Sequence, residues 1–125
     1  MAQILQPTTF DAGTQKSYSI FSDADVAHDT AVAVKASAGR VKWVSVLNKH
    51  ATEAGWLLFY NAAVGDITEG TTVPDFYIGF GSIAAGAVNM HINLVFNTAI
   101  SIACSAVPIG NGALNTDPAV AILYT

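Results

Sequence analysis

Hydrophobic and polar residues alternate along several short stretches of this chain. Between residues 89 and 96, the apolar side chains of Met90, Ile92 and Leu94 fall on one side and polar side chains on the other. Residues 100–106 show the same period of two. Such alternation predicts a β-strand with one buried face. Further stretches rich in β-branched and aromatic residues, bounded by turn-forming residues, predict strands at residues 17–21, 30–36, 40–48, 55–61, 76–80 and 119–124.

The strand pattern predicts an all-β fold, a two-sheet antiparallel sandwich of the jelly-roll or Greek-key type. Residues 16–125 are expected to form this single β-sandwich domain. Two local features are expected within it. The pair Asn97-Thr98 lies between two alternating stretches and predicts a tight hairpin. Residues 23–35 are rich in alanine and favour either a helix or a strand.

Residues 1–15 are expected to form an extended N-terminal arm. They contain Pro7 and show neither a helical nor a strand period. The apolar residues Ile4, Leu5 and Phe10 lie in this arm and are candidate assembly contacts. A frayed terminus is the alternative interpretation.

Two of the expected strands are apolar on both faces. In residues 40–48, Trp43 and Leu47 point one way while Val44 and Val46 point the other, and residues 55–61 are similar. An antiparallel sheet in a monomer usually exposes one face to water. The pattern therefore predicts that the arm, a loop or another subunit covers the second face.

The composition supports a protein that contacts other proteins. Hydrophobic residues make up 52% of the chain and charged residues 11%, against about 25% in typical domains. Residues 76–116 contain no charged side chain, and depletion of charge is typical of interface cores. The net charge of −4 argues against binding to nucleic acid. Apolar runs are too short for a membrane span, and the absence of a signal peptide predicts synthesis in a cytoplasm.

Candidate chemistry is sparse in the sequence. His28, His50, His91 and Cys104 share no metal-ligand spacing, and Cys104 is expected to be an inert core thiol. We therefore expect no catalytic residues, no cofactor and no metal, and hence no enzyme.

Two further patterns leave an alternative open. Asp23, Asp25 and Asp29 do not fit the EF-hand pattern, which leaves a solvated acidic turn or a calcium site of another kind. The aromatic residues of residues 43–60 favour the core, with a sugar-stacking surface as the alternative.

Several motifs follow one another in residues 40–125. A valine-rich strand ending at Asn48 is followed by Phe59-Tyr60-Asn61 and then by Gly70-Thr71-Thr72-Val73-Pro74. After these come Gly86, the segment from Phe96 to Ile102 and a terminal strand from Val120 to Tyr124. This order of motifs resembles a family of small jelly-roll virion proteins of tailed phages, the capsid decoration or cement proteins.

This resemblance implies a trimer bound to the outside of a phage capsid. The implied partners are the major capsid protein and further copies of this chain, and the implied location is the capsid exterior of the virion. Some similar proteins belong to tails or fibres, so a tail or fibre module that binds a host glycan is the alternative function. The resemblance transfers no catalytic residues.

Overall fold

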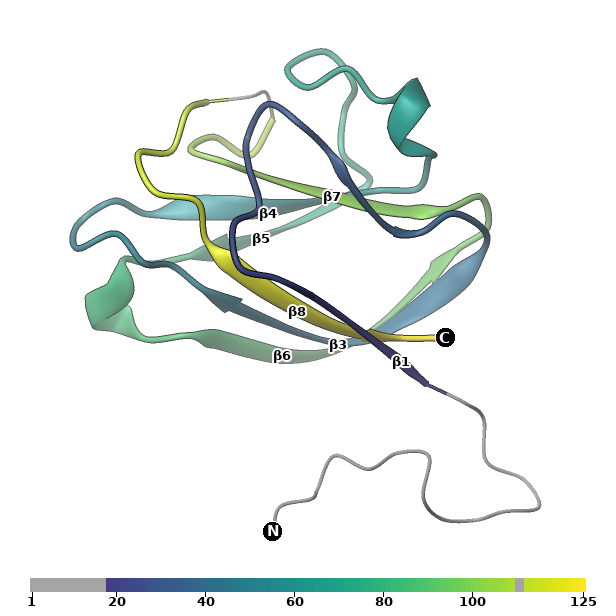
Figure 1. Cartoon of the computed structure of the whole chain (residues 1–125), viewed down its shortest axis with the longest axis horizontal. Helices are drawn as coiled ribbons and strands as arrows, with labels where there is room; N and C mark the ends of the chain where they lie inside the picture. The colour runs from purple at the N-terminus through teal and green to yellow at the C-terminus, as the bar shows by residue number, and fades with distance from the viewer. Residues whose placement is uncertain (1–17, 110–111) are drawn as a thin grey trace, which may run out of the picture.

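The computed structural model describes residues 18–109 and 112–125, and these residues form a sandwich of β-strands (Figure 1). Two short 3-10 helices, η2 (Val64–Asp66) and η3 (Ile83–Ala85), lie in the loops. The predicted arm of residues 1–15 lies outside the described residues. The strands are β1 (Ser19–Asp23), β2 (Val32–Lys35), β3 (Gly39–Leu47), β4 (Gly55–Tyr60), β5 (Phe76–Phe80), β6 (Val88–Phe96), β7 (Ile100–Ser105) and β8 (Ala119–Tyr124).

The strands form two antiparallel four-stranded sheets packed face to face. Sheet A has the order β1-β8-β3-β6, and sheet B has the order β2-β7-β4-β5. Among the described strands, only β4 and β5 are consecutive in the chain and paired in one sheet. All other consecutive strands lie in opposite sheets, which is the jelly-roll arrangement. The predicted fold class is therefore confirmed.

The predicted hairpin at Asn97-Thr98 is wrong. β6 pairs with β3 in sheet A, whereas β7 pairs with β2 and β4 in sheet B, so this link crosses between the sheets. The Oδ1 atom of Asn61 accepts a hydrogen bond of 2.9 Å from the backbone N–H of Thr98. Phe96 and Ile100 on either side of the link are both buried. A short polar link between two alternating strands can thus connect strands of opposite sheets as well as the two strands of a hairpin.

Residues 24–31 form the loop between β1 and β2, residues 32–35 form β2, and no helix is present in this segment. The backbone N–H of Val26 donates to the carbonyl oxygen of Pro118 at 2.9 Å, and the carbonyl of Ala27 accepts from Cys104 at 3.1 Å. Val26 is buried, so the backbone of this segment lies against the core. Its polar groups are paired by hydrogen bonds to Pro118, which precedes β8, and to Cys104 of β7. Of the two structures that the alanine-rich sequence allowed, the strand is the one observed.

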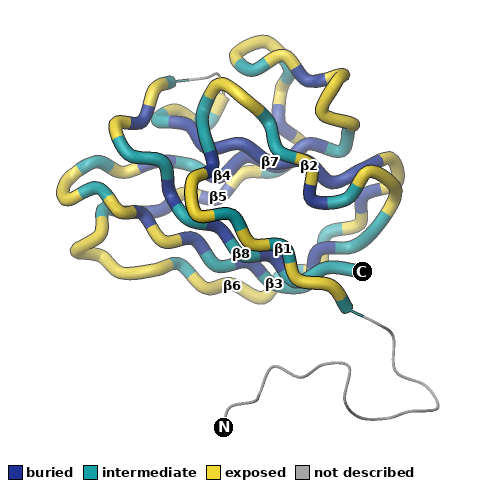
Figure 2. Tube along the Cα trace, in the orientation of Figure 1, coloured by how far each residue is buried: buried dark blue, intermediate teal, exposed yellow. Residues whose placement is uncertain are grey.

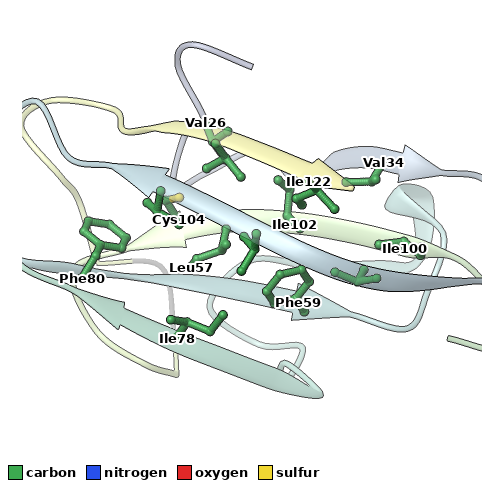
Figure 3. Close-up of a cluster of buried hydrophobic side chains, with 14 of the residues drawn as sticks. Val26, Val34, Leu57, Phe59, Ile78, Phe80, Ile100, Ile102, Cys104 and Ile122 are labelled. Atoms are coloured by element: carbon green, nitrogen blue, oxygen red, sulfur yellow. The ribbon is translucent and has the colours of Figure 1, made fainter. Parts of the chain in front are cut away.

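The hydrophobic core lies between the two sheets (Figure 3). Each sheet contributes the alternate residues of its strands, such as Val44 and Ile122 from sheet A and Leu57 and Ile102 from sheet B, all fully buried. Cys104 lies in this core as predicted. Burial of the apolar surface of such side chains contributes about 1.5–3 kcal/mol each. The alternation of apolar and polar residues in the sequence therefore corresponds to the side chains that form the core between the sheets.

The outer face of sheet B carries a second, smaller apolar cluster. Leu58 and Tyr60 of β4 and Ala103 of β7 are buried there beneath Ile67, which belongs to the long β4–β5 connection. Two hydrogen bonds involving residues of the connection hold it over sheet B. Ser101 donates a hydrogen bond of 2.7 Å to the carbonyl of Ala62, and Glu69 accepts one of 2.7 Å from the N–H of Ala31. A loop therefore covers the second apolar face of residues 55–60, as one of the predicted alternatives required.

Candidate assembly surface

The outer face of sheet A carries an apolar row that no described segment covers. Ile20 of β1 lies opposite Leu123 of β8, and Leu123 lies opposite Trp43 of β3. Trp43 in turn lies opposite His91 of β6, so the apolar row spans three strands and ends at a polar residue on the fourth. The side chain of Ile20 is 60% exposed, and Trp43 and Leu123 are half-buried. Single exposed hydrophobic residues are common, but adjacent apolar side chains on three neighbouring strands form a connected patch, which is typical of a protein contact site.

A shallow trough runs beside this apolar row. The neighbouring cross-strand row consists of small residues, with Ala121 opposite both Ser22 and Ser45. These residues, together with Leu47, line an open hollow of about 220 Å³. Because short side chains expose the sheet between the larger side chains of Trp43 and Leu47, the face has relief into which a protruding side chain can fit.

The charged residues of this face gather at its ends. Arg40 and Lys42, with Tyr18 and Thr125, line a second hollow of about 170 Å³ at one end of the sheet. Arg40 also donates a hydrogen bond of 2.9 Å to the side chain of Asn93. The residues paired in the two middle rows, Ile20–Leu123–Trp43 and Ser22–Ala121–Ser45, are uncharged. This arrangement of an apolar centre and a polar rim is typical of protein–protein interfaces.

The aromatic residues of the predicted strands divide between core and surface. Phe59 and Tyr60 are buried, as the favoured interpretation required. Trp43 and Trp56 are only half-buried, and each lies on the outer face of its sheet. The sequence could not distinguish the buried aromatic residues from the half-buried tryptophans, since the strands that carry them are apolar on both faces.

Trp56 and Tyr77 form an aromatic pair on the outer face of sheet B. Their ring centroids lie 5.6 Å apart with an interplanar angle of 82°. A Cβ atom at Gly79 would lie 3.2 Å from the Trp56 ring, so the absence of a side chain there lets the indole lie close over β5. The side chain of Tyr77 is 43% exposed. These features describe a small aromatic platform beside an edge strand.

The three aspartates of the acidic cluster make separate contacts. Asp23 accepts a hydrogen bond from the backbone N–H of Asp25, and the carboxylate of Asp25 pairs with the Lys49 ammonium at 2.7 Å. The carboxylate of Asp29 accepts a hydrogen bond of 3.4 Å from the hydroxyl of Thr30. Across the described ranges, no group of three or more His, Cys, Asp or Glu residues is placed to hold a metal ion.

The histidines lie apart in the fold. His50 accepts backbone hydrogen bonds from Thr52 and Glu53 through Nδ1 and so shapes the β3–β4 loop. His91 is exposed on β6. Burial raises the pKa of the Cys104 thiol, with a smaller contribution from the charges of Asp117 and Asp23. The thiol is therefore protonated and enclosed in the core, which disfavours nucleophilic chemistry.

The sequence-based candidates Ile4, Leu5 and Phe10 lie outside the described residues. Of the residues that form the apolar row and the trough, the sequence pattern singled out Trp43 and Leu47 but not Ile20 and Leu123. Ile20 and Leu123 lie at opposite ends of the chain, and only the strand register brings them together. In the part of the chain that the structure describes, no helix is long and apolar enough to cross a membrane.

No protein-family model, no curated protein and no solved structure matches this chain.

Proposed function

We propose that this chain is a structural virion protein, a capsid decoration (cement) protein that binds the outer surface of a phage head and stabilises it. The observation that carries this proposal is the apolar row Ile20–Leu123–Trp43 on the outer face of sheet A. That face is apolar along the row, and none of residues 18–109 and 112–125 covers it, so it suits a broad protein surface better than a small ligand. The low charge of the chain and the resemblance described above support the same function.

The proposal includes self-association and a place in the virion. A cement protein grips several shell subunits at once, so that modest contacts add through high effective concentration. The resemblance implies three copies, with the major capsid protein as the partner and the host cytoplasm as the place of synthesis. Ile4, Leu5 and Phe10 belong to this proposal as further contacts, on the ground of their apolar character in the sequence.

Binding to phage heads that lack this protein tests the proposal. We expect the wild-type chain to occupy such heads and to raise the temperature at which they release DNA. Ile20→Asp places a charge within the apolar row and should abolish occupancy. Val73→Asp is the matched control, because Val73 is 62% exposed but lies in the β4–β5 connection. Equal occupancy by both variants, or no binding by the wild type, would contradict the proposed surface.

Deletion of residues 1–15 tests the contribution of the arm separately. We expect the truncated chain to bind heads more weakly than the full chain. Unchanged occupancy and unchanged stabilisation of the heads would exclude Ile4, Leu5 and Phe10 as contacts while leaving the sheet A surface in place.

The aromatic pair Trp56–Tyr77 favours a second candidate function, a tail or fibre module that binds a host glycan. Sugars stack on exposed aromatic rings, and this pair is accessible beside β5. A glycan array with the wild-type chain and with Trp56→Ala tests this candidate. Saturable binding that Trp56→Ala removes would favour it over capsid decoration, and an array without signal would exclude it.

A further inference from the structure

β6 is the longest edge strand of the sandwich and carries little protection against pairing. It lies at the end of sheet A and spans nine residues, none of which is charged, proline or glycine. Natural sheets usually shield an edge by making it short, charged, bulged or proline-containing. The only one of these features in β6 is a register shift opposite residues 41–43 of β3. Next to this shift, Val88 to His91 pair regularly with β3.

The other three edge strands are protected. β1 has five residues and ends in Asp23, and β2 has four residues, a register shift and Lys35. β5 has five residues and contains Gly79. The contrast with β6 shows that the open edge is a property of one strand and not of the whole sandwich. Figure 2 shows β6 as largely exposed along the border of the sheet.

The hydrophobic interior reaches the surface at this edge. Met90 lies opposite Val44, and Val44 lies opposite Ile122. Val44 and Ile122 are 0% exposed, whereas Met90, in the same core-facing row, is 36% exposed. A residue that points to the core yet remains this exposed indicates that the described sandwich does not close over the edge.

The neighbouring edge of sheet B lies on the same side of the sandwich. The ring of Phe59 packs against Phe76 of β5 at 6.0 Å and against Phe96 of β6 at 6.1 Å, measured between ring centroids. Both edges fall within residues 76–116, which contain no charged side chain. Both edge strands on this side are therefore uncharged in themselves, and the Arg40 side chain of β3 reaches β6 at Asn93.

A second copy of the same strand is the partner that fits this edge. In a two-fold contact each strand meets its own sequence, so a charged residue near the axis would face its copy and repel it. β6 carries no charge, and its outward-facing Asn89 and His91 can each donate and accept hydrogen bonds, while the side-chain oxygen of Asn93 already accepts from Arg40. The strand is thus complementary to itself in charge and in hydrogen bonding.

We propose that the β6 edges of two copies pair antiparallel about a two-fold axis near Met90 and His91. This pairing joins two copies of sheet A into one continuous eight-stranded sheet and covers the exposed side of Met90. An axis perpendicular to the sheet keeps the outer faces of both sheets on the same side. The two apolar rows then lie side by side, which doubles the surface available to one partner.

The β6 contact is independent of the proposed capsid binding. It uses the edge of sheet A and not its outer face, so a monomer becomes a dimer without occupying the apolar row. Loss of capsid binding would therefore not alter the mass in solution, and loss of β6 pairing would not remove the apolar row on sheet A. The two proposals can fail separately.

A charge at the centre of the pairing tests the contact. We expect light scattering of the purified full-length chain to show a mass that is halved by His91→Lys, because the two lysines would face each other across the axis. Ala33→Lys is the matched control, since Ala33 is exposed on the edge strand β2 of the opposite side, and it should leave the mass unchanged. Circular dichroism verifies that both variants are folded.

A cysteine variant gives a positive signal for the same contact. Residues opposite each other in antiparallel strands have Cβ atoms about 4.5–5.5 Å apart, so His91→Cys should form a disulfide-linked dimer under mild oxidation. Cys104 is buried and does not compete. A wild-type mass unaffected by His91→Lys, together with no more crosslinking in His91→Cys than in Ala33→Cys, would overturn the proposal. A shell-derived strand bound at β6 instead would appear as protection of residue 91 from thiol reagents only on phage heads.

Discussion

Trp43 and Leu123 lie opposite each other on neighbouring strands of sheet A, and both side chains face outward. In sheet B the corresponding outward position of Tyr60 is buried, because Ile67 of the β4–β5 connection packs over it. The two sheets of the sandwich therefore differ in what covers their outer faces. One face is completed by the chain itself, and the other leaves a connected apolar row that a partner can cover.

The difference between core-facing and outward-facing isoleucines can be measured. Ile102→Ala removes a fully buried side chain between the sheets and should lower the free energy of unfolding by about 2–5 kcal/mol. Ile20→Ala removes a side chain that is 60% exposed and should change it by less than about 0.5 kcal/mol. Urea unfolding of both variants provides the comparison. A large loss of stability in Ile20→Ala would show that Ile20 belongs to the core.

The crossing between β6 and β7 should depend on Asn61. Its Oδ1 atom accepts from the N–H of Thr98, and its Nδ2 atom donates to Asn97 at 2.8 Å. Asn61→Ala removes both bonds, and we expect a loss of about 1–2 kcal/mol in the free energy of unfolding. Asn61→Asp retains an acceptor for Thr98 and should lose less. Equal stability of Asn61→Ala and the wild type would show that the crossing does not need this side chain.

The sequence predicted the strands well because each strand has a strong local signal. The period of two in residues 89–96 and the β-branched residues of 40–48 depend only on neighbouring residues, and strands β3 and β6 lie at those positions. The partner of each strand depends on distant contacts, so the crossing at Asn97-Thr98 could not be distinguished from a hairpin. The assembly surface could not be predicted for the same reason, because Ile20 and Leu123 become neighbours only through the register of β1 and β8.

Cys104 should make the protein less stable in alkaline solution. Burial raises the pKa of its thiol above the ordinary value of 9.0. The folded state therefore holds the proton more tightly than the unfolded state, and this stabilisation is complete below pH 9.0 and is lost as the pH rises above it. We expect the urea midpoint to fall above that pH.

The variant Cys104→Val is the control for this loss, because valine fills a similar volume without a titratable group. Its urea midpoint should fall less over the same range of pH. A parallel fall in both proteins would assign the loss to other groups. In the native state at neutral pH, the wild-type thiol should react with thiol reagents only as fast as the protein unfolds.

Tyr60 provides a test of how the β4–β5 connection is held over sheet B. Burial raises the pKa of its hydroxyl, and the negative charge of Glu69 raises it further. Glu69→Gln removes the charge but keeps an acceptor for the N–H of Ala31, so the pKa of Tyr60 should fall while remaining above the ordinary value of 10.0. Ultraviolet titration of wild type and Glu69→Gln measures the change, and Tyr60→Phe identifies the signal of this residue among the four tyrosines. The contribution of Tyr60 to the free energy of unfolding is complete below pH 10.0 and is lost as the pH rises above it. Glu69→Gln should therefore also reduce the loss of stability in alkaline solution.

An unchanged titration curve would mean that Glu69 does not lie close to Tyr60 in solution. The β4–β5 connection would then not cover sheet B in the manner described.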